Sequence, residues 1–211
     1  SAAAASLGCR FATAFRALEA QARLHAGEWV AIFGCGGVGL SAIMVAAAMG
    51  ARIIAIDIQE NKLDKAKELG ADIVINSRKV PNIVEAIRDI SQGGVQVSMD
   101  ALGSPDTCFT AIASLAKRGR HVQVGLMLAD HKHPAIPMDL VIARELEIYG
   151  SHGIQAYRYN ILLGMIEAEK LHPECLIEAR LSLRQGIDFL QKMDRFPGIG
   201  INVITSMQDN S

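Results

Sequence analysis

A glycine-rich run at 34–39, with the sequence Gly-Cys-Gly-Gly-Val-Gly, carries the strongest chemical signal in the chain. It directly follows an apolar, strand-like run and opens a helix-like run. Glycines in such a turn allow a tight bend, bring the backbone close to a ligand and let the helix pack closely on the sheet. The helix also directs its positive end at bound phosphates. The pattern therefore predicts a diphosphate-binding turn. Its expected contact residues are Gly34, Gly36, Gly37, Val38 and Gly39.

An acidic residue, Asp57, ends the next strand-like run, 18 residues after Gly39. A carboxylate at this place accepts hydrogen bonds from the hydroxyls of an adenosine ribose and repels a 2′-phosphate. The sequence therefore favours NAD(H) over NADP(H) as the cofactor. Lys62 follows five residues later and is a candidate for the same ribose edge, although a solvated charge on a helix explains it equally well.

Strand-like and helix-like segments alternate around these residues. The strands are continuous apolar runs, as in a parallel sheet that helices cover on both faces, and the crossovers are too long for hairpins. The sequence predicts an α/β fold with a doubly wound, six-stranded parallel sheet of the Rossmann type. Expected strands are 29–33, 52–56, 72–75, 95–102, 121–125 and 146–150, and expected helices are 6–22, 38–49, 60–69, 81–91, 106–116 and 139–144.

The tail from about residue 153 has a different texture, with expected helices at 157–171 and 184–193, an extended segment at 177–183 and a strand at 201–205. It is short for an independent domain, and the chain opens without an initiator methionine. We therefore expect three parts. They are the end of a catalytic domain and a hinge at 1–9, a dinucleotide-binding domain at 10–152, and a return to the incomplete catalytic domain at 153–211.

The composition argues against several classes of function. The net charge of −1 gives no electrostatic basis for binding nucleic acid or an anionic membrane. The uncharged stretch at 29–51 has the length of a membrane span, but its glycines separate a strand pattern from a helix pattern, so a buried β-turn-α unit explains it better. The four cysteines form no C-x-x-C pair, and we expect neither a disulfide framework nor a structural zinc site. A reducing, cytoplasmic setting is the expected location.

The segment at 7–14, Leu-Gly-Cys-Arg-Phe-Ala-Thr-Ala, makes the pattern more specific. Together with the G-x-G-G-x-G turn, it resembles the medium-chain dehydrogenase/reductase superfamily, and within it the zinc-dependent alcohol dehydrogenases, over essentially the whole chain. In members with a catalytic zinc, the cysteine of this segment is the third protein ligand, and the N-terminal catalytic domain supplies the first two. The resemblance implies that Cys9 is a zinc ligand in the full-length protein. Without it, a lone cysteine on an apolar helix is usually a small buried hydrophobe.

The resemblance also implies further cofactor contacts. Thr13 matches a threonine beside the nicotinamide, and Val38 matches the residue behind the nicotinamide ring. The turn after the fourth strand lies along the cofactor in the family, and the backbone after the fifth strand meets the carboxamide. In this sequence these residues are Ala101, Leu102 and Gly103 after the fourth strand, and Val124, Gly125 and Leu126 after the fifth.

The sequence departs from the family pattern at three positions. Cys35 stands where a larger aliphatic side chain is more usual, and packing is its expected role. Arg10 stands where a small residue commonly follows the zinc cysteine. Many members place an arginine in the last strand to contact the pyrophosphate. This chain has Asn202 there, which puts that contact in doubt.

Taken together, the residues and the resemblance predict an NAD-dependent zinc alcohol dehydrogenase. A catalytic zinc leaves one position open for the substrate oxygen, and hydride passes between the alcohol carbon and the nicotinamide. The expected substrate is a small alcohol or the corresponding aldehyde or ketone. This chain alone is expected to be inactive, with no catalytic residue beyond the zinc ligand. The alternatives are a zinc-free quinone or enoyl reductase, which Asp57 and Cys9 argue against, and a non-catalytic dinucleotide-binding module.

The sixth expected strand, at 146–150, is predicted to lie at an edge of the sheet. An exposed strand edge invites pairing with another chain. In the family, two such edges pair across a twofold axis into a twelve-stranded sheet. We therefore expect a homodimer or a homotetramer formed through this edge.

Overall fold

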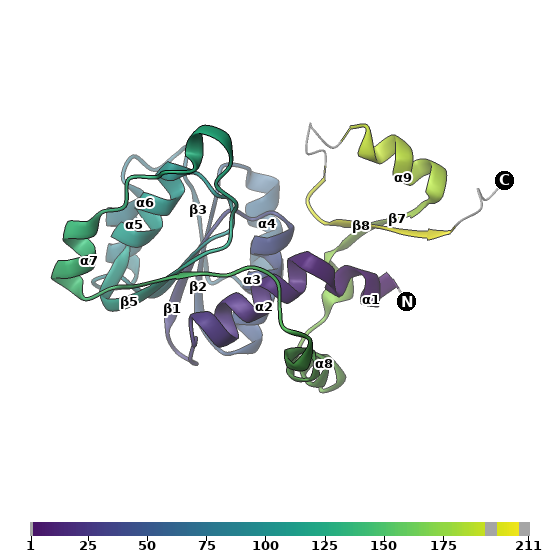
Figure 1. Cartoon of the computed structure of the whole chain (residues 1–211), viewed down its shortest axis with the longest axis horizontal. Coiled ribbons are helices and arrows are strands. Elements are labelled where there is room, and N and C mark those ends of the chain that lie inside the picture. Colours follow the sequence, from purple (N-terminus) through teal and green to yellow (C-terminus); the bar gives the residue numbers. More distant parts are fainter. Residues whose placement is uncertain (1, 193–197, 207–211) are drawn as a thin grey trace.

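The computed structural model describes residues 2–192 and 198–206, and within them six parallel strands form the larger of two sheets (Figure 1). The strand order is β3-β2-β1-β4-β5-β6, which is the order of the doubly wound dinucleotide-binding fold. The predicted fold class is therefore confirmed. The strands are β1 (Trp29–Phe33), β2 (Arg52–Asp57), β3 (Ile73–Asn76), β4 (Val95–Asp100), β5 (Leu115–Gln123) and β6 (Glu147–Gly150).

Helices cover both faces of this sheet (Figure 1). One face packs against the N-terminal helical segments and against α3 (Gly37–Ala48) and α4 (Glu60–Glu68). The other packs mainly against α5 (Ile83–Ile90) and α6 (Pro105–Ala113), with α7 (Met138–Arg144) beside them. None of the helices in the described part of the chain combines the length and the apolar character that crossing a bilayer requires.

The central strand β1 shows why the sheet is buried on both faces. Val30 and Ile32 belong to the core beneath α3, whereas Ala31 and Phe33 belong to the core beneath α5 and α6. Successive side chains of a strand point to opposite faces, so an entirely apolar strand supplies both cores. Full burial of an isoleucine or phenylalanine side chain contributes about 1.5–3 kcal/mol to folding. The carboxyl end of β1 is thereby held rigidly, and the glycine turn begins there.

The N-terminal segment is helical, but it is not the single regular helix expected at 6–22. It consists of α1 (Ala2–Ser6), the π-helical η1 (Leu7–Phe11), α2 (Ala12–Arg16) and the π-helical η2 (Ala17–Gln21). Gly8, with ψ at −141°, leaves the helical conformation and kinks the chain directly before Cys9. Such π-turns interrupt regular helices frequently at functional sites.

Two other boundaries differ from the expected ones. The helix expected at 106–116 ends at Ala113, and β5 begins at residue 115 rather than 121, with a register shift against the start of β4. The fourth and fifth strands end at Asp100 and Gln123, before the expected 102 and 125. The chain leaves β4 early because the Asp100 carboxylate accepts hydrogen bonds from the two following backbone N–H groups that are free to turn, those of Leu102 and Gly103.

The C-terminal part forms a separate, two-stranded parallel sheet. It contains β7 (Ile177–Ser182) and β8 (Ile201–Ser206), joined through α9 (Leu183–Leu190), and it lies beside α1 and apart from the larger sheet (Figure 1). The helix expected at 157–171 is shorter, α8 (Tyr159–Glu167), because Glu169 takes a left-handed conformation with φ at +54°. Short 3-10 turns are η3 (Ala129–His131), η4 (Ala156–Arg158) and η5 (Pro173–Leu176). The end of the helix expected at 184–193 lies outside the described residues.

Candidate cofactor-binding site

The glycine turn lies between β1 and α3, at the place where the strand order reverses between β1 and β4. Gly34 has φ at +91°, and its N–H donates to the carbonyl of Ile56 at 2.8 Å. A Cβ added to Gly39 would stand only 1.7 Å from the Gly34 carbonyl oxygen, so α3 approaches the turn too closely for any side chain. Open doubly wound sheets bind ligands at this reversal point.

The carboxylate of Asp57 is held at this turn. Its Oδ2 accepts a hydrogen bond from the N–H of Cys35 at 2.7 Å, and its Oδ1 accepts from the N–H groups of Ile58 and Gln59 at 2.7 and 3.0 Å. Asp57 keeps 9% of its surface exposed. Since three backbone donors fix its orientation, the carboxylate is a preorganised acceptor, and its remaining lone pairs are free for ribose hydroxyls.

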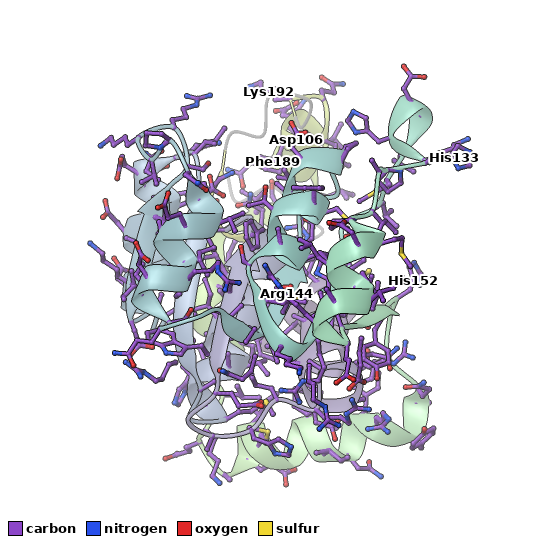
Figure 2. The ribbon with its side chains drawn as sticks, turned by 90° about the vertical axis from the view of Figure 1, so that its left-hand side faces the viewer. Asp106, His133, Arg144, His152, Phe189 and Lys192 are labelled. Atoms are coloured by element: carbon purple, nitrogen blue, oxygen red, sulfur yellow. The ribbon has the colours of Figure 1, made fainter. Side chains whose placement is uncertain are left out.

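Two cavities meet at the glycine turn. One, of about 440 Å³, is lined by Asp57, Gly34 and Leu102 together with residues of α5 and α6. The other, of about 420 Å³, is lined by residues 36–38 of the turn, by Lys62 and by residues of β8 and α9. Asp106 lines the first and Phe189 the second, and both lie toward the same end of the molecule (Figure 2). An elongated ligand laid across the turn has room on both sides.

The loops after β4 and β5, which the sequence singles out, contact each other directly. A Cβ added to Gly103 would lie 2.5 Å from the Leu126 carbonyl oxygen, and one added to Gly125 would lie 2.2 Å from the Gly103 nitrogen. The two backbones therefore touch, and both positions require glycine. Leu102 and Leu126 are 59% and 62% exposed beside this contact, which leaves two apolar side chains at the sheet edge available to a ligand.

A buried polar network below these loops escaped the sequence analysis. Asp100 is fully buried. Its Oδ1 accepts from the N–H groups of Leu102 and Gly103 at 2.8 and 3.0 Å, and its Oδ2 accepts from Thr107 Oγ1 and Gln123 Nε2, each at 3.0 Å. A buried carboxylate is tolerated only with such partners. The signal in the sequence was an acid after an apolar strand, the same signal as for Asp57, but we expected the strand to continue to 102.

The network continues into the sheet through His121, which is fully buried. Gln123 uses its amide nitrogen to donate to Asp100 and to the Gly125 carbonyl at 2.9 Å, so its oxygen must accept from His121 Nε2 at 3.2 Å. His121 Nδ1 then accepts from the Ser98 hydroxyl at 3.0 Å. Burial lowers the pKa of His121, and the Gln123 hydrogen bond and the charge of Asp100 oppose this shift. The imidazole is therefore neutral at pH 7.

Thr13 and Ser151 leave buried hydroxyls unsatisfied. Among the described side chains, their Oγ atoms are the buried ones without a hydrogen-bond partner. Thr13 lies on α2, and Arg16 of α2 donates to the His152 carbonyl at 3.0 Å, which ties this helix to the segment after β6. A buried hydroxyl without a partner costs about 1–3 kcal/mol. A polar ligand group that bonded these hydroxyls would regain that free energy. The sequence gave no signal for Ser151.

Cys9 is exposed on η1, after the kink at Gly8. Across residues 2–192 and 198–206, no group of three or more His, Cys, Asp or Glu side chains is arranged to hold a metal ion. A thiolate is a good zinc ligand, and catalytic zinc sites take three protein ligands. The described part of this chain therefore offers one donor of such a set.

Two further side chains have structural rather than chemical roles. Cys35 is fully buried, its thiol faces the Ile56 carbonyl at 3.8 Å, and burial raises its pKa far above the usual value, with the Asp57 carboxylate acting in the same direction. The thiol is therefore protonated and inert, and the expected packing role of Cys35 is confirmed. His152 points to the outside of the molecule (Figure 2) and is exposed, and its backbone carbonyl is the group that Arg16 contacts.

The comparisons with known proteins agree with this geometry. A family model described as zinc-binding dehydrogenase matches residues 37–168. An NAD-dependent alcohol dehydrogenase of Sulfurisphaera tokodaii is 32% identical over 204 residues, which are 95% of this chain and 57% of that protein.

Solved structures show the same likeness. A 2R,3R-butanediol dehydrogenase of Bacillus subtilis superposes with a TM-score of 0.85 at 25% identity, over 94% of this chain and 57% of its own. An alcohol dehydrogenase of Aeropyrum pernix does so with a TM-score of 0.80 at 30% identity, over 95% and 57%. The chain thus spans little more than half the length of the proteins that it resembles. The family match, the strand order and the glycine turn together show that this chain belongs to the zinc-binding dehydrogenase family.

Proposed function

We propose that this chain is the cofactor-binding part of an NAD-dependent zinc alcohol dehydrogenase, which transfers hydride between an alcohol and its aldehyde or ketone. The observation that carries the proposal is the Asp57 carboxylate, fixed by backbone donors at the glycine turn between two cavities. An acid at this position accepts from both ribose hydroxyls and repels a 2′-phosphate, so NAD(H) is the expected cofactor.

The residues place the parts of the cofactor in a definite order. The adenosine end belongs in the cavity beside Asp57, where Leu102 and residues of α5 and α6 supply apolar surface. The pyrophosphate belongs at the glycine turn, against the amino end of α3. The nicotinamide end belongs toward Val38, the loop at 124–126 and Thr13, whose buried hydroxyl has no partner among the described residues.

For the metal, we propose Cys9 as one zinc ligand of the whole protein. The support is the family match and the exposed thiol on a kinked π-helical turn, one turn before Thr13. A zinc ion bound there supplies Lewis-acid polarisation of the substrate oxygen. The described part of this chain holds the thiol donor and the Thr13 hydroxyl, so the remaining ligands and the proton relay belong to other parts of the protein.

The remaining expectations stand as proposals of the same kind. Residues 10–152 form the dinucleotide-binding domain, and residues 1–9 and 153–211 belong with a catalytic domain. The two-stranded sheet of β7 and β8, which packs on α1, supports this grouping. We also propose a homodimer or homotetramer formed through β6, and a reducing, cytoplasmic setting. The four cysteines all lie in the described part of the chain and are free, which supports that setting.

The test is calorimetric titration of the chain with NAD⁺ and NADP⁺. We expect NAD⁺ to bind at least about tenfold more tightly, a difference of about 1.4 kcal/mol. Asp57→Asn removes the repulsive charge and one strong acceptor, so it should weaken NAD⁺ binding and abolish the preference. Asp64→Asn, which removes an exposed carboxylate from α4, is the matched control and should behave like the unaltered chain. Equal or tighter NADP⁺ binding by the unaltered chain would contradict the role of Asp57.

A further inference from the structure

The side chain of Arg10 lies against the glycine turn. A Cβ added to Gly37 would stand 2.7 Å from Arg10 Cδ and 3.0 Å from Arg10 Nη1. The guanidinium of Arg10 is therefore stacked on the backbone at the first residue of α3, although the two residues are far apart in sequence. This contact also explains why position 37 has no side chain, because any Cβ would displace Arg10.

The cavity on this side of the turn is positively charged. Of the described residues that line it, the charged ones are Arg10 and Lys62, and none is acidic. Within residues 2–192 and 198–206, Arg10 has no ion-pair or hydrogen-bond partner, and it is exposed. The positive end of α3 points to the same place. An unpaired guanidinium beside a helix amino end and a glycine turn forms a surface complementary to an anion.

The same cavity shows that the usual cation is replaced. Asn202 of β8 lines it, at the place where the family resemblance leads one to look for an arginine. An asparagine amide donates hydrogen bonds but carries no charge. Arg10, from the opposite wall, supplies a planar fork of donors that suits two phosphate oxygens at once.

We propose that Arg10 binds the cofactor pyrophosphate and supplies the positive charge that the last strand lacks in this chain. The inference rests on the proposed function and refines it, because it assigns the phosphate contact to the residue next to Cys9. A bound diphosphate then has the backbone N–H groups of the turn on one side and the Arg10 guanidinium on the other. Arg10 also couples the cofactor to the segment that carries the proposed zinc ligand.

The experiment compares Arg10→Ala with the unaltered chain in titrations with NAD⁺, ADP-ribose and adenosine. Loss of a charge-assisted contact to phosphate should weaken NAD⁺ and ADP-ribose binding about 10- to 100-fold. Adenosine, which has no phosphate, should bind unchanged. Arg10→Lys keeps the charge but not the fork, so it should recover part of the affinity. Lys117→Ala, which removes an exposed cation near the start of β5, is the charge-matched control and should change none of the three.

The outcomes separate this inference from the proposed function. If Arg10→Ala binds NAD⁺ as tightly as the unaltered chain does, the inference is overturned and the proposed function stands. An equal loss of adenosine affinity would also overturn it, because Arg10 would then act by shaping the turn. If the unaltered chain binds neither NAD⁺ nor ADP-ribose, the proposed function fails, and the inference fails with it.

Discussion

Asp57 and Asp100 end two strands of the same sheet, and each uses one carboxylate oxygen to accept from two backbone N–H groups that follow it. They differ in what remains. Asp57 lines a cavity and keeps a small exposed area, whereas Asp100 is fully buried, and Thr107 and Gln123 occupy its second oxygen. Similar residues therefore have different roles: Asp57 is available to a ligand, and Asp100 fixes the loop that the ligand contacts.

Substitution of Asp100 should destabilise the fold more than most single changes do. Asp100→Ala leaves two N–H groups, a hydroxyl and an amide without their acceptor in a buried site. We expect the free energy of unfolding to fall by roughly 3 kcal/mol, the upper end for a lost hydrogen-bonding charge. Urea denaturation followed by circular dichroism measures it. Asp64→Ala on the exposed face of α4 should stay within about 0.5 kcal/mol. Similar losses in both variants would refute the structural role of Asp100.

At the scale of elements, β4 and β5 are joined by more than their backbone ladder. The Ser98 hydroxyl and the His121 imidazole bridge the two strands, and Gln123 links this pair to Asp100. The imidazole is enclosed, so its protonation would place a charge in the sheet. The position of the two loops at the cofactor edge thus depends on a group that titrates near neutral pH.

This arrangement predicts a pH dependence of stability. Burial lowers the pKa of His121 below its ordinary value of 6.5, so the unfolded chain binds the proton first as the pH falls. The stabilisation from the neutral imidazole is therefore complete above about pH 6.5, and it is lost as the pH falls below that value. The slope should reach at most about 1.4 kcal/mol per pH unit.

Urea denaturation between pH 5 and 8 tests this prediction by difference. His121→Gln offers a donor to Gln123 and an acceptor to Ser98 without titrating, so its stability should vary less with pH than that of the unaltered chain. His152→Gln, at an exposed position, should retain the full pH dependence. The prediction fails if all three chains lose stability in parallel below pH 6.5.

The sequence located most elements but not all of their ends. The central strand at 29–33 matches because its five apolar residues are buried on both faces, whatever surrounds them. The N-terminal helix was predicted as regular, whereas Gly8 kinks it and two π-turns interrupt it. Periodicity reports which face is buried, but a π-turn shifts that face by a single residue, which is too little to be seen in a short segment.

At the scale of the whole molecule, many apolar side chains remain exposed on the C-terminal elements and on the β6 side. Ile161 and Leu163 lie on α8, and Leu190 lies on α9. On the other side, Ile142 of α7 is 74% exposed and Ile148 of β6 is 39% exposed. Large exposed apolar groups commonly mark surfaces that other protein segments cover.

We predict that the β6 edge mediates self-association. Light scattering of the chain over a range of concentrations should show a dimer or tetramer. Ile148→Lys, which places a charge on this edge strand, should shift the mass toward the monomer. Ile161→Lys places the same charge on α8 and should leave the mass unchanged. A monomer at all concentrations, or a dimer that survives Ile148→Lys, would argue against association through β6.

The sequence by itself determined the local parts of this protein. The turn between Gly34 and Gly39 follows from the backbone conformations and the close approach that only glycine permits, and these depend on a few neighbouring residues. The position of Asp57 follows from the length of one β-α-β unit. The strand order was also accessible, because continuous apolar strands with long crossovers admit few other arrangements.

The tertiary structure decided the contacts between distant segments. The stacking of Arg10 on Gly37, the crossing of Gly103 with Gly125 and the unsatisfied hydroxyl of Thr13 are invisible in any short window of the sequence. Each depends on how one element packs on another, and packing is set by the summed burial of many side chains rather than by a local pattern. For this reason the glycine turn was predicted from the chain alone, while the cation beside it was recognised only once the chain had folded.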